Sequence, residues 1–301
     1  MPQPRSVQGE DYFLGAALYF FWGIMPAYLK QFHVASPYEV IIHRLIWSFL
    51  FLLLFVWMTN RLGEVKRGAL NSRVLRLLAI SSLLASTNWL LNVIAAAENH
   101  ILAISLGYFL APLVNVSLGV LILHERVSRA QKVAIGLAGA GVALMAVVAL
   151  TTLWMSIAMA LSFGFYGLIR KVAPVEASAG LTIETALMTP FALLGMAWLH
   201  SHGAASFGHD TRESLLLISC GIVMMAPLLV FGVVVRRLSL VAVGLLQFIA
   251  PSVSFLIALF VYHEPLGLQK LMSFILIWTG LVVFSRDVVV RASAARKAAQ
   301  P

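Results

Sequence analysis

Charge is scarce in this sequence. Charged residues make up 11% of the chain, against roughly 25% in ordinary soluble domains, while hydrophobic residues make up 61%. Cysteine occurs once, as Cys220, so no intrachain disulfide can form. The sequence has no Walker loop, no His-Glu-x-x-His motif and no Asp-rich cation site. These absences exclude a disulfide scaffold and an ordinary soluble enzyme, and we expect no cofactor and no bound metal.

Long apolar runs fill the chain instead, and its mean hydropathy is +0.94. A helix needs about 20 apolar residues to cross a bilayer. Runs of this length predict ten membrane-spanning helices, near residues 12–29, 38–58, 75–97, 102–123, 131–150, 152–170, 180–199, 214–235, 241–262 and 267–285. The glycine-rich run 136–141 lies inside the fifth span, so it predicts close helix packing rather than a nucleotide-binding loop.

Lysine and arginine fall almost entirely in alternate loops between these spans. Arg44 lies within a span, and only Lys30, Arg212 and Lys270 fall on the opposite side. Cytoplasmic loops are the ones enriched in Lys and Arg, so this pattern predicts that both termini are cytoplasmic. Because the basic residues lie in short loops beside lipid, the pI of about 10.1 does not indicate nucleic-acid binding.

Two halves of the chain resemble each other. The segment 106–112 (Leu-Gly-Tyr-Phe-Leu-Ala-Pro) is matched by 245–251 (Leu-Leu-Gln-Phe-Ile-Ala-Pro), at an offset of 139 residues. The His-Glu pair at 124–125 recurs at 263–264 with the same offset. Five spans in each half would give the halves opposite orientations, which is the inverted-repeat plan common among secondary transporters.

Prolines within the spans predict helix kinks. Pro112 and Pro251 each leave a carbonyl four residues earlier without its usual donor, and those carbonyls belong to Tyr108 and Gln247. Two related kinks that face a central cavity and bind cargo are one interpretation, and kinks kept for helix packing are the other. Pro227, in the eighth span, is a further candidate for a kink or gate.

Polar and aromatic side chains inside the spans are candidate cargo contacts. Asn88 and Asn92 are four residues apart, so they share one helix face. With Asn115 they either line a cavity or join helices by hydrogen bonds. Trp22 and Tyr166 each precede a glycine in related spans, where they either wall a pocket or mark a close helix contact.

Few charges lie inside the spans. The run 36–39 (Ser-Pro-Tyr-Glu) fits a capping box, so we expect Glu39 to cap its own helix. Glu184 is expected in the first turns of its span, where the helix dipole favours an acid. His43 and Arg44 lie one to two turns into the second span, and Arg44 either marks a functional site or extends to the outer surface.

No acidic residue is predicted near the middle of the bilayer. The three aspartates, Asp11, Asp210 and Asp287, lie at or beyond the ends of spans. Proton-driven transporters usually keep an acid within the membrane, so we expect transport that needs no imposed proton gradient. Glu184 is the first acid to suspect if that expectation fails.

Several segments together resemble one family, the RarD group of the EamA transporters in the drug/metabolite transporter superfamily. The resemblance covers about residues 12–286 and is carried by the segments 37–39, 43–48, 88–92, 105–109, 112–115 and 244–251. It implies a ten-helix permease of the bacterial inner membrane, in a group sometimes labelled chloramphenicol-sensitive. Phe248 and Ala250 stand where the family leads us to expect Tyr and Gly.

The sequence therefore predicts an all-α integral membrane carrier with two inverted five-helix repeats, 12–150 and 151–286, and a basic tail at 287–301. We expect it to move a small organic metabolite or drug by alternating access, with export favoured over import. The alternatives are an uncoupled channel and, less favoured because the chain lacks a nucleophile, a metal set and a soluble domain, a membrane enzyme or sensor. The expected partners are the cargo and membrane lipid.

Overall fold

The computed structural model describes residues 9–98, 100–147, 150–263 and 267–298, and every regular element in these ranges is helical. The elements are α1 (Gly9–Leu29), α2 (Pro37–Met58), α3 (Leu62–Leu70), α4 (Ser72–Ala97), α5 (Ile101–Leu121), α6 (Arg129–Ala146), the 3-10 turn η1 (Leu150–Thr152), α7 (Leu153–Val172), α8 (Ala177–Ser201), α9 (Thr211–Arg237), α10 (Leu240–Gln247), α11 (Ile249–Phe260) and α12 (Leu268–Ala298). The predicted all-α membrane architecture is confirmed.

Nine helices in the described ranges are long and apolar enough to cross a membrane, against ten predicted. One of the nine, Leu240–Phe260, comprises α10 and α11, which are separated by Phe248 alone. The predicted span 131–150 corresponds to α6, which has 18 residues and opens with a polar turn that contains Arg129 and Lys132. That polar turn leaves α6 outside the nine, so the tenth span stays a prediction.

Contacts divide the chain into two compact units. Unit 1 comprises Met1–Ile24, Ala95–Gly164 and Arg237–Pro301, and unit 2 comprises Met25–Ile94 and Phe165–Arg236. Each unit contains residues from both predicted repeats. This division describes contacts rather than internal similarity, so the repeats 12–150 and 151–286 and the tail 287–301 stay predictions.

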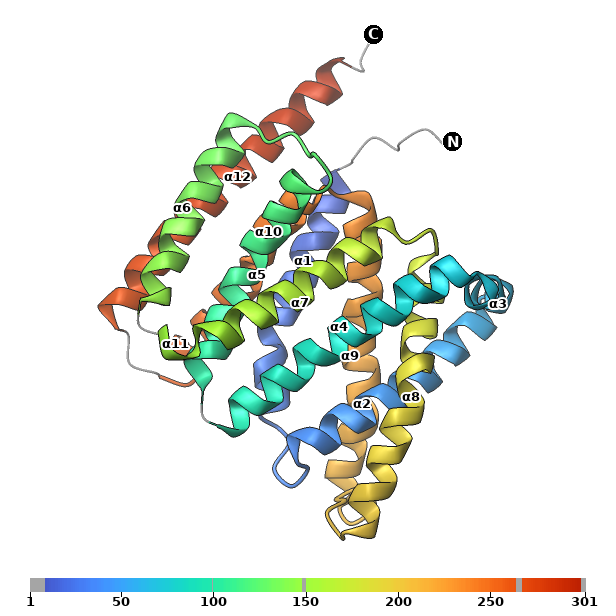
Figure 1. Cartoon of the computed structure of the whole chain (residues 1–301). Helices are drawn as coiled ribbons and strands as arrows, with labels where there is room; N and C mark the ends of the chain where they lie inside the picture. The colour runs from blue at the N-terminus through green and yellow to red at the C-terminus, as the bar shows by residue number, and fades with distance from the viewer. Residues whose placement is uncertain (1–8, 99, 148–149, 264–266, 299–301) are drawn as a thin grey trace. The chain divides into compact units, whose positions relative to one another are not determined.

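Within unit 1, α6 and α12 lie side by side (Figure 1). Small residues allow the close approach: a Cβ at Gly141 would lie 2.7 Å from the carbonyl oxygen of Ser273, and a Cβ at Gly280 would lie 2.8 Å from that of Ala134. The other two glycines of the run 136–141 face open space. The predicted packing role is therefore confirmed for Gly141 alone.

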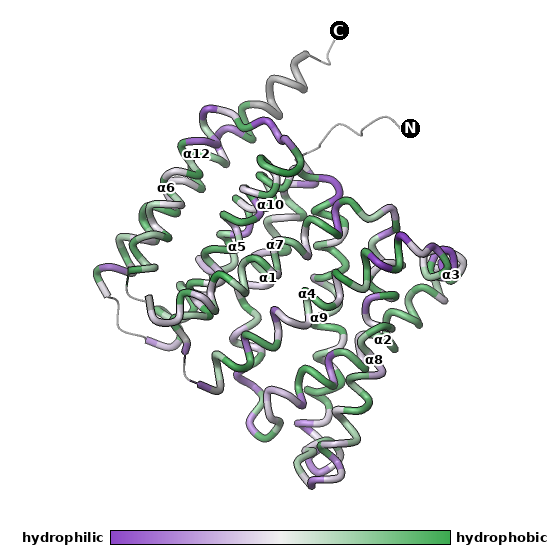
Figure 2. The backbone as a smooth tube through the Cα atoms, in the orientation of Figure 1, coloured by the Kyte–Doolittle hydropathy of each residue, from purple (hydrophilic) through white to green (hydrophobic). Residues whose placement is uncertain are grey.

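Within unit 2, α2 and α8 lie side by side (Figure 1), and Gly221 of α9 packs directly on Trp47 of α2. The short helix α3 was not predicted. It lies in the predicted loop between the second and third spans and rests on α8, where Gly68 faces Ile183. Figure 2 shows hydrophilic residues along α3, whereas the long helices are mainly hydrophobic.

Large apolar side chains cover much of the outside of the spanning helices. Leu83 on α4 is 62% exposed and Leu194 on α8 is 69% exposed. A soluble protein would leave such side chains in water at a cost of about 1.5–3 kcal/mol each, whereas lipid accepts them. The exposed surface therefore suits the bilayer that the sequence predicts.

Candidate functional site

The start of α2 in unit 2 is only partly as predicted. Ser36 is the N-cap, Pro37 is the first helical residue, and the N–H of Glu39 donates to Ser36 Oγ at 3.2 Å. The prediction that Glu39 caps its own helix is wrong, because its buried carboxylate accepts hydrogen bonds from the loop between α8 and α9. The donors are Ser206 N at 2.8 Å, Ser206 Oγ at 2.9 Å and Phe207 N at 3.1 Å.

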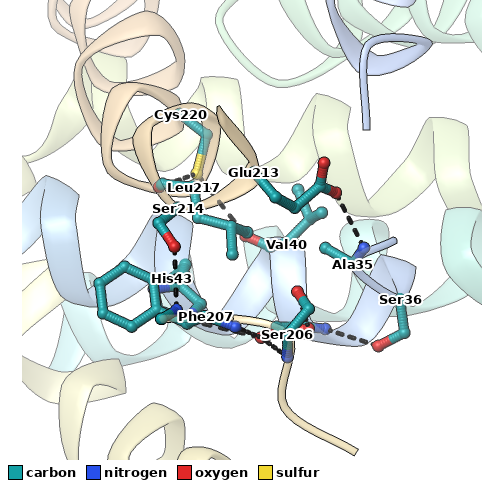
Figure 3. Close-up of polar contacts among 12 residues, drawn as sticks. Ala35, Ser36, Val40, His43, Ser206, Phe207, Glu213, Ser214, Leu217 and Cys220 are labelled. Carbon is teal, nitrogen blue, oxygen red and sulfur yellow. Dashed lines mark hydrogen bonds and ion pairs between the residues drawn. The ribbon is translucent and has the colours of Figure 1, made fainter. Parts of the chain in front are cut away.

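The start of α9 has the matching arrangement. Asp210 Oδ1 accepts from the N–H of Glu213 at 2.7 Å. The Glu213 carboxylate accepts from two N–H groups in the loop between α1 and α2, Val34 N at 3.1 Å and Ala35 N at 2.8 Å. Figure 3 shows the contact with Ala35. Each glutamate is the third residue of its helix and binds the loop that precedes the other helix. We call Glu39 with Ser206–Phe207 and Glu213 with Val34–Ala35 the exchanged caps.

His43 lies beside the exchanged caps. Its Nε2 is 3.9 Å from Glu39 Oε1, and its ring packs on Phe207 with centroids 4.7 Å apart (Figure 3). The Nδ1 atom accepts from Trp47 Nε1 at 3.1 Å, so Nδ1 must carry a lone pair and the neutral ring must carry its hydrogen on Nε2. Nε2 is buried without a hydrogen-bond partner.

Arg44 is buried rather than extended to the outer surface. Its side chain stays within unit 2, where the guanidinium carbon lies 3.9 Å from the centre of the Trp89 ring. A cation over an indole face is stabilised by the ring quadrupole, by about 2 kcal/mol when both groups are desolvated. The alternative that Arg44 extends to the surface is therefore wrong.

Glu184 is also deeper than predicted. Because α8 begins at Ala177 rather than near residue 180, Glu184 is its eighth residue, about two turns inside the helix and buried. Its Oε1 atom accepts from Ser81 Oγ at 2.5 Å and lies 3.6 Å from Arg170 Nη1. Tyr166 is hydrogen-bonded to the same carboxyl. We call these four residues the Glu184 network.

Arg170 is the residue of this network that the sequence analysis missed, because the charge pattern assigned it to a cytoplasmic loop. It lies in the last turn of α7 and is buried, with Nη2 donating to the carbonyl of Ala177 at 2.8 Å. The guanidinium fills a slot between two glycines. A Cβ at Gly180 would collide with Nη1, and a Cβ at Gly232 would lie 2.7 Å from Nη2. The sequence offered no local signal for this burial, because the two glycines lie on other helices.

The two predicted kinks differ from each other in unit 1. α5 continues through Pro112, whereas the helix breaks at Phe248, directly after Gln247 and three residues before Pro251. Tyr108 is 52% exposed, whereas Gln247 is buried. α9 likewise continues through Pro227. Of the three prolines, Pro251 alone follows a break in its helix.

The amides have partners of two kinds. Asn115 Nδ2 donates to Gln247 Oε1 at 2.7 Å, which joins α5 to α10 as the hydrogen-bonding interpretation expected. Asn115 Oδ1, however, is buried without a partner. Asn92 Nδ2 instead donates within its own helix, to the carbonyl of Asn88 at 2.8 Å. That bond joins no second helix.

The aromatic candidates are packed against other rings. Trp22 lies against Phe163, with centroids 5.9 Å apart, and Tyr166 is stacked on Phe231 at 5.7 Å. Gly23, beside Trp22, faces Val253 closely, so a close helix contact, one of the two interpretations, is present there.

His124, Glu125 and His263 lie just beyond the ends of helices, after α5 and α11. Glu125 accepts from the first backbone N–H groups of α10, Leu240 N at 2.8 Å and Val241 N at 2.9 Å. Glu125 therefore has a terminal hydrogen-bonding role, while Glu264 lies outside the described residues. Within the described ranges, no three His, Cys, Asp or Glu side chains are grouped so that they could hold a metal ion.

The chain is similar to known proteins along nearly its whole length. A model of the EamA-like transporter family matches residues 11–147. An uncharacterized transporter of Vibrio cholerae is 39% identical over 286 residues, 95% of each chain. Protein RarD of Escherichia coli K12 is 37% identical over 284 residues, 92% of this chain and 94% of the relative. Chloramphenicol-sensitive protein RarD of Pseudomonas aeruginosa is 26% identical over 93% of this chain and 95% of the relative.

A solved crystal structure shares the fold, with a TM-score of 0.70, 17% identity, and coverage of 92% of this chain and 98% of its own. Apolar spanning helices with charged groups buried among them, and relatives named as transporters, define a multi-pass transporter of the bacterial inner membrane. The chain belongs to the RarD group of the EamA-like transporter family, since relatives above 30% identity cover most of it.

Proposed function

We propose that the protein carries a small organic metabolite or drug across the inner membrane by alternating access, with export favoured over import. The observation that carries this proposal is the placement of buried polar groups along α8. Glu184 is its eighth residue, about two turns inside the helix, and the loop that binds Glu39 follows its end. Buried charges inside membrane helices commonly mark a transport pathway, and an alternating-access carrier needs separable contacts towards both sides.

The inverted-repeat organisation forms part of the proposal. His124 and His263, which the 139-residue offset pairs, both have a left-handed backbone, with φ values of 52° and 53°. Non-glycine residues rarely adopt this conformation, so its recurrence at paired positions supports related halves. The family model matches 11–147, which is nearly the first proposed repeat. We propose cytoplasmic termini on the charge pattern.

The cargo contacts proposed from the sequence are Trp22, Asn88, Asn92, Tyr108, Asn115, Tyr166 and Gln247. Asn115 has the clearest unused capacity among them, because its Oδ1 atom is buried without a partner. A buried acceptor left unpaired costs about 1–3 kcal/mol, and a cargo hydroxyl or amide N–H would remove that cost. This capacity favours a polar, hydrogen-bonding cargo. One relative is named chloramphenicol-sensitive, and chloramphenicol is accordingly the first compound to try.

The test is a comparison of small molecules inside cells of a deletion strain, its parent, and the deletion strain that carries the gene on a plasmid. Export predicts that at least one organic compound accumulates inside the deletion strain and returns to the parental level with the plasmid. Depletion of the compound would indicate import, and the absence of any plasmid-reversible difference would count against the proposal.

Counterflow then separates a carrier from a channel. Proteoliposomes are loaded with the unlabelled compound that the comparison identifies, and uptake of the labelled compound is followed. A carrier gives transient accumulation above equilibrium because its binding site must reorient, whereas a channel gives equilibration alone.

A further inference from the structure

We propose that Glu184 is a proton-binding site, and that proton uptake there opens the α7–α8 seam, the contact between the Arg170 side chain and residues 177–184. This inference rests on the proposed carrier function and adds its coupling ion. It also replaces the expectation that transport needs no imposed proton gradient, which placed Glu184 in the first turns of its span.

The partners of Glu184 are those of an ionised carboxylate. Ser81 Oγ donates to it at 2.5 Å and Arg170 Nη1 lies 3.6 Å away. Tyr166 adds a phenolic hydroxyl. An ionised carboxylate accepts from all three, whereas a protonated one carries an O–H that must itself find an acceptor. The closed seam is therefore built around the charged form.

Proton uptake changes the charge balance of the seam. One oxygen of Glu184 gains the proton, so the pair with Arg170 changes from net zero to one positive charge. Arg170 cannot release a proton in exchange. It keeps the carbonyl of Ala177 as a partner at 2.8 Å, but its Nε is already buried without one. A buried cation without its counter-ion is strongly unfavourable, so the arrangement in which water reaches Arg170 becomes favoured.

The slot between the two glycines restricts the Arg170 guanidinium to two positions, so its response to protonation of Glu184 is a switch rather than a gradual shift. Gly180 on α8 and Gly232 on α9 hold the guanidinium between them. A planar group in a fitted slot is either seated or withdrawn, because packed contacts tolerate little sliding. The protonation state of Glu184 therefore selects between two positions of Arg170.

Other charged groups lie on the helices around α8, and two of them have partners other than Glu184 and Arg170. Lys171 donates to the carbonyl of Val235 at 2.9 Å, and Arg236 lies 3.8 Å from Glu176. The remaining charged or titratable groups on these elements are Glu64, Lys66 and Arg67 on α3, Arg73 and Arg76 on α4, Tyr38, Glu39, His43 and Arg44 on α2, His200 on α8, and Arg212, Glu213, Cys220 and Arg237 on α9. Among the described residues, Arg170 is the cation that the structure pairs with Glu184.

A cysteine reporter tests the proposal without any cargo. Cys220 is the chain's one cysteine and is buried, so Cys220→Ala gives a clean background. Ser178 follows Ala177 in the seam, and its Oγ is buried without a partner, so Ser178→Cys loses no hydrogen bond. The alkylation rate of this cysteine by N-ethylmaleimide then reports opening of the seam. The full-length protein is used in vesicles of phosphatidylethanolamine and phosphatidylglycerol.

The measured quantity is the alkylation rate in Glu184→Gln divided by the rate with Glu184 present, at each pH between about pH 9 and about pH 5. The ratio cancels the titration of the thiol itself. Glutamine imitates the protonated acid, so we expect a ratio of about tenfold at high pH, equivalent to one pH unit of coupling. The ratio should fall to one as acid protonates Glu184. A ratio that does not change with pH, or rises on acidification, overturns the proposal.

Two further variants keep the test decisive. Glu184→Asp retains a titratable acid and should restore the pH dependence, which a purely structural role of the side chain would not require. Glu39→Gln, at another buried glutamate of unit 2, should leave that dependence as it is in the parent. If Glu184→Gln does not fold, Ser81→Ala serves instead: it should shift the pH at which the reporter accelerates, and an unshifted profile counts against the proposal. Failure of transport assays would affect the carrier function, but not this result.

Discussion

Unit 2 stabilises its buried glutamate carboxylates in two different ways. In the exchanged caps, the carboxylates of Glu39 and Glu213 accept mainly from backbone N–H groups of loops, and Glu39 also accepts from the hydroxyl of Ser206. In the Glu184 network, the carboxylate lies beside the guanidinium of Arg170 and accepts from Ser81. The first arrangement depends on loop conformation, and the second depends on charge balance.

This difference predicts different responses to mutation. Backbone donors cannot be removed by a side-chain substitution, so each exchanged cap is sensitive mainly to its glutamate and, for Glu39, also to the hydroxyl of Ser206. Arg170 and Glu184 are both side chains, and removal of either one leaves the other charge buried and uncompensated. Removal of one partner of a buried ion pair costs about 3–5 kcal/mol, whereas removal of both can be nearly neutral.

The largest expected effect follows from Arg170→Met. We expect it to lower the free energy of unfolding by about 3–5 kcal/mol, because Glu184 is left without its cation. Unfolding of the purified protein in mixed micelles with increasing SDS measures this change. The double variant Arg170→Met with Glu184→Gln should recover most of the loss. If the single and double variants are equally unstable, the ion pair does not carry the effect.

A smaller loss is expected from Glu39→Gln. The amide keeps one acceptor oxygen for three donors, so the free energy of unfolding should fall by about 1–3 kcal/mol. The loop 202–210 should also be cut faster by an added protease. Thr59→Ala, at the other end of α2, is the matched control because Thr59 Oγ1 donates to carbonyls of its own helix, those of Phe55 and Val56. Equal cleavage of both variants would contradict the exchanged caps.

A still smaller effect is expected from Ser36→Ala. This substitution removes the N-cap of α2 but leaves the carboxylate of Glu39 in place, and loss of an N-cap costs about 1 kcal/mol. Thermal unfolding in detergent measures it. If Ser36→Ala costs more than Glu39→Gln, the local cap rather than the exchanged contact secures the start of α2.

The smallest effect on stability is expected from reporter fusions, which show on which side of the membrane a given residue lies. A fusion in the loop between α8 and α9 locates the exchanged caps. Fusions after His209 and after Pro301 should report opposite sides, with residue 209 in the periplasm, because the loops around it are poor in Lys and Arg. Alkaline phosphatase and a fluorescent protein give complementary signals. Reports from one compartment for both fusions would refute the ten-span topology.

Features that depend on neighbouring residues, such as helix spans and helix starts, could be predicted from the sequence. Contacts between residues far apart in the chain could not. Apolar length placed nine spans, and the Ser36–Pro37 pair placed the start of α2. The partner of Glu39 could not be predicted, because Ser206 is 167 residues away in the chain. Arg170 was assigned to a loop because its burial depends on Gly180 and Gly232, whose helices had first to be packed. The cargo residues remain untested, since hydrogen-bonding capacity does not reveal which faces meet a ligand.

The exchanged caps also impose an order on the synthesis of the protein. The backbone N–H groups of Val34 and Ala35 donate to the carboxylate of Glu213, which is 179 and 178 residues further along the chain. At typical rates of translation, that separation corresponds to a delay on the order of ten seconds or more. During this interval the first loop has been made but its stabilising acid has not. The start of α2 therefore reaches its final form only after α9 has entered the membrane, and a nascent chain halted before residue 213 retains an unfinished first hairpin.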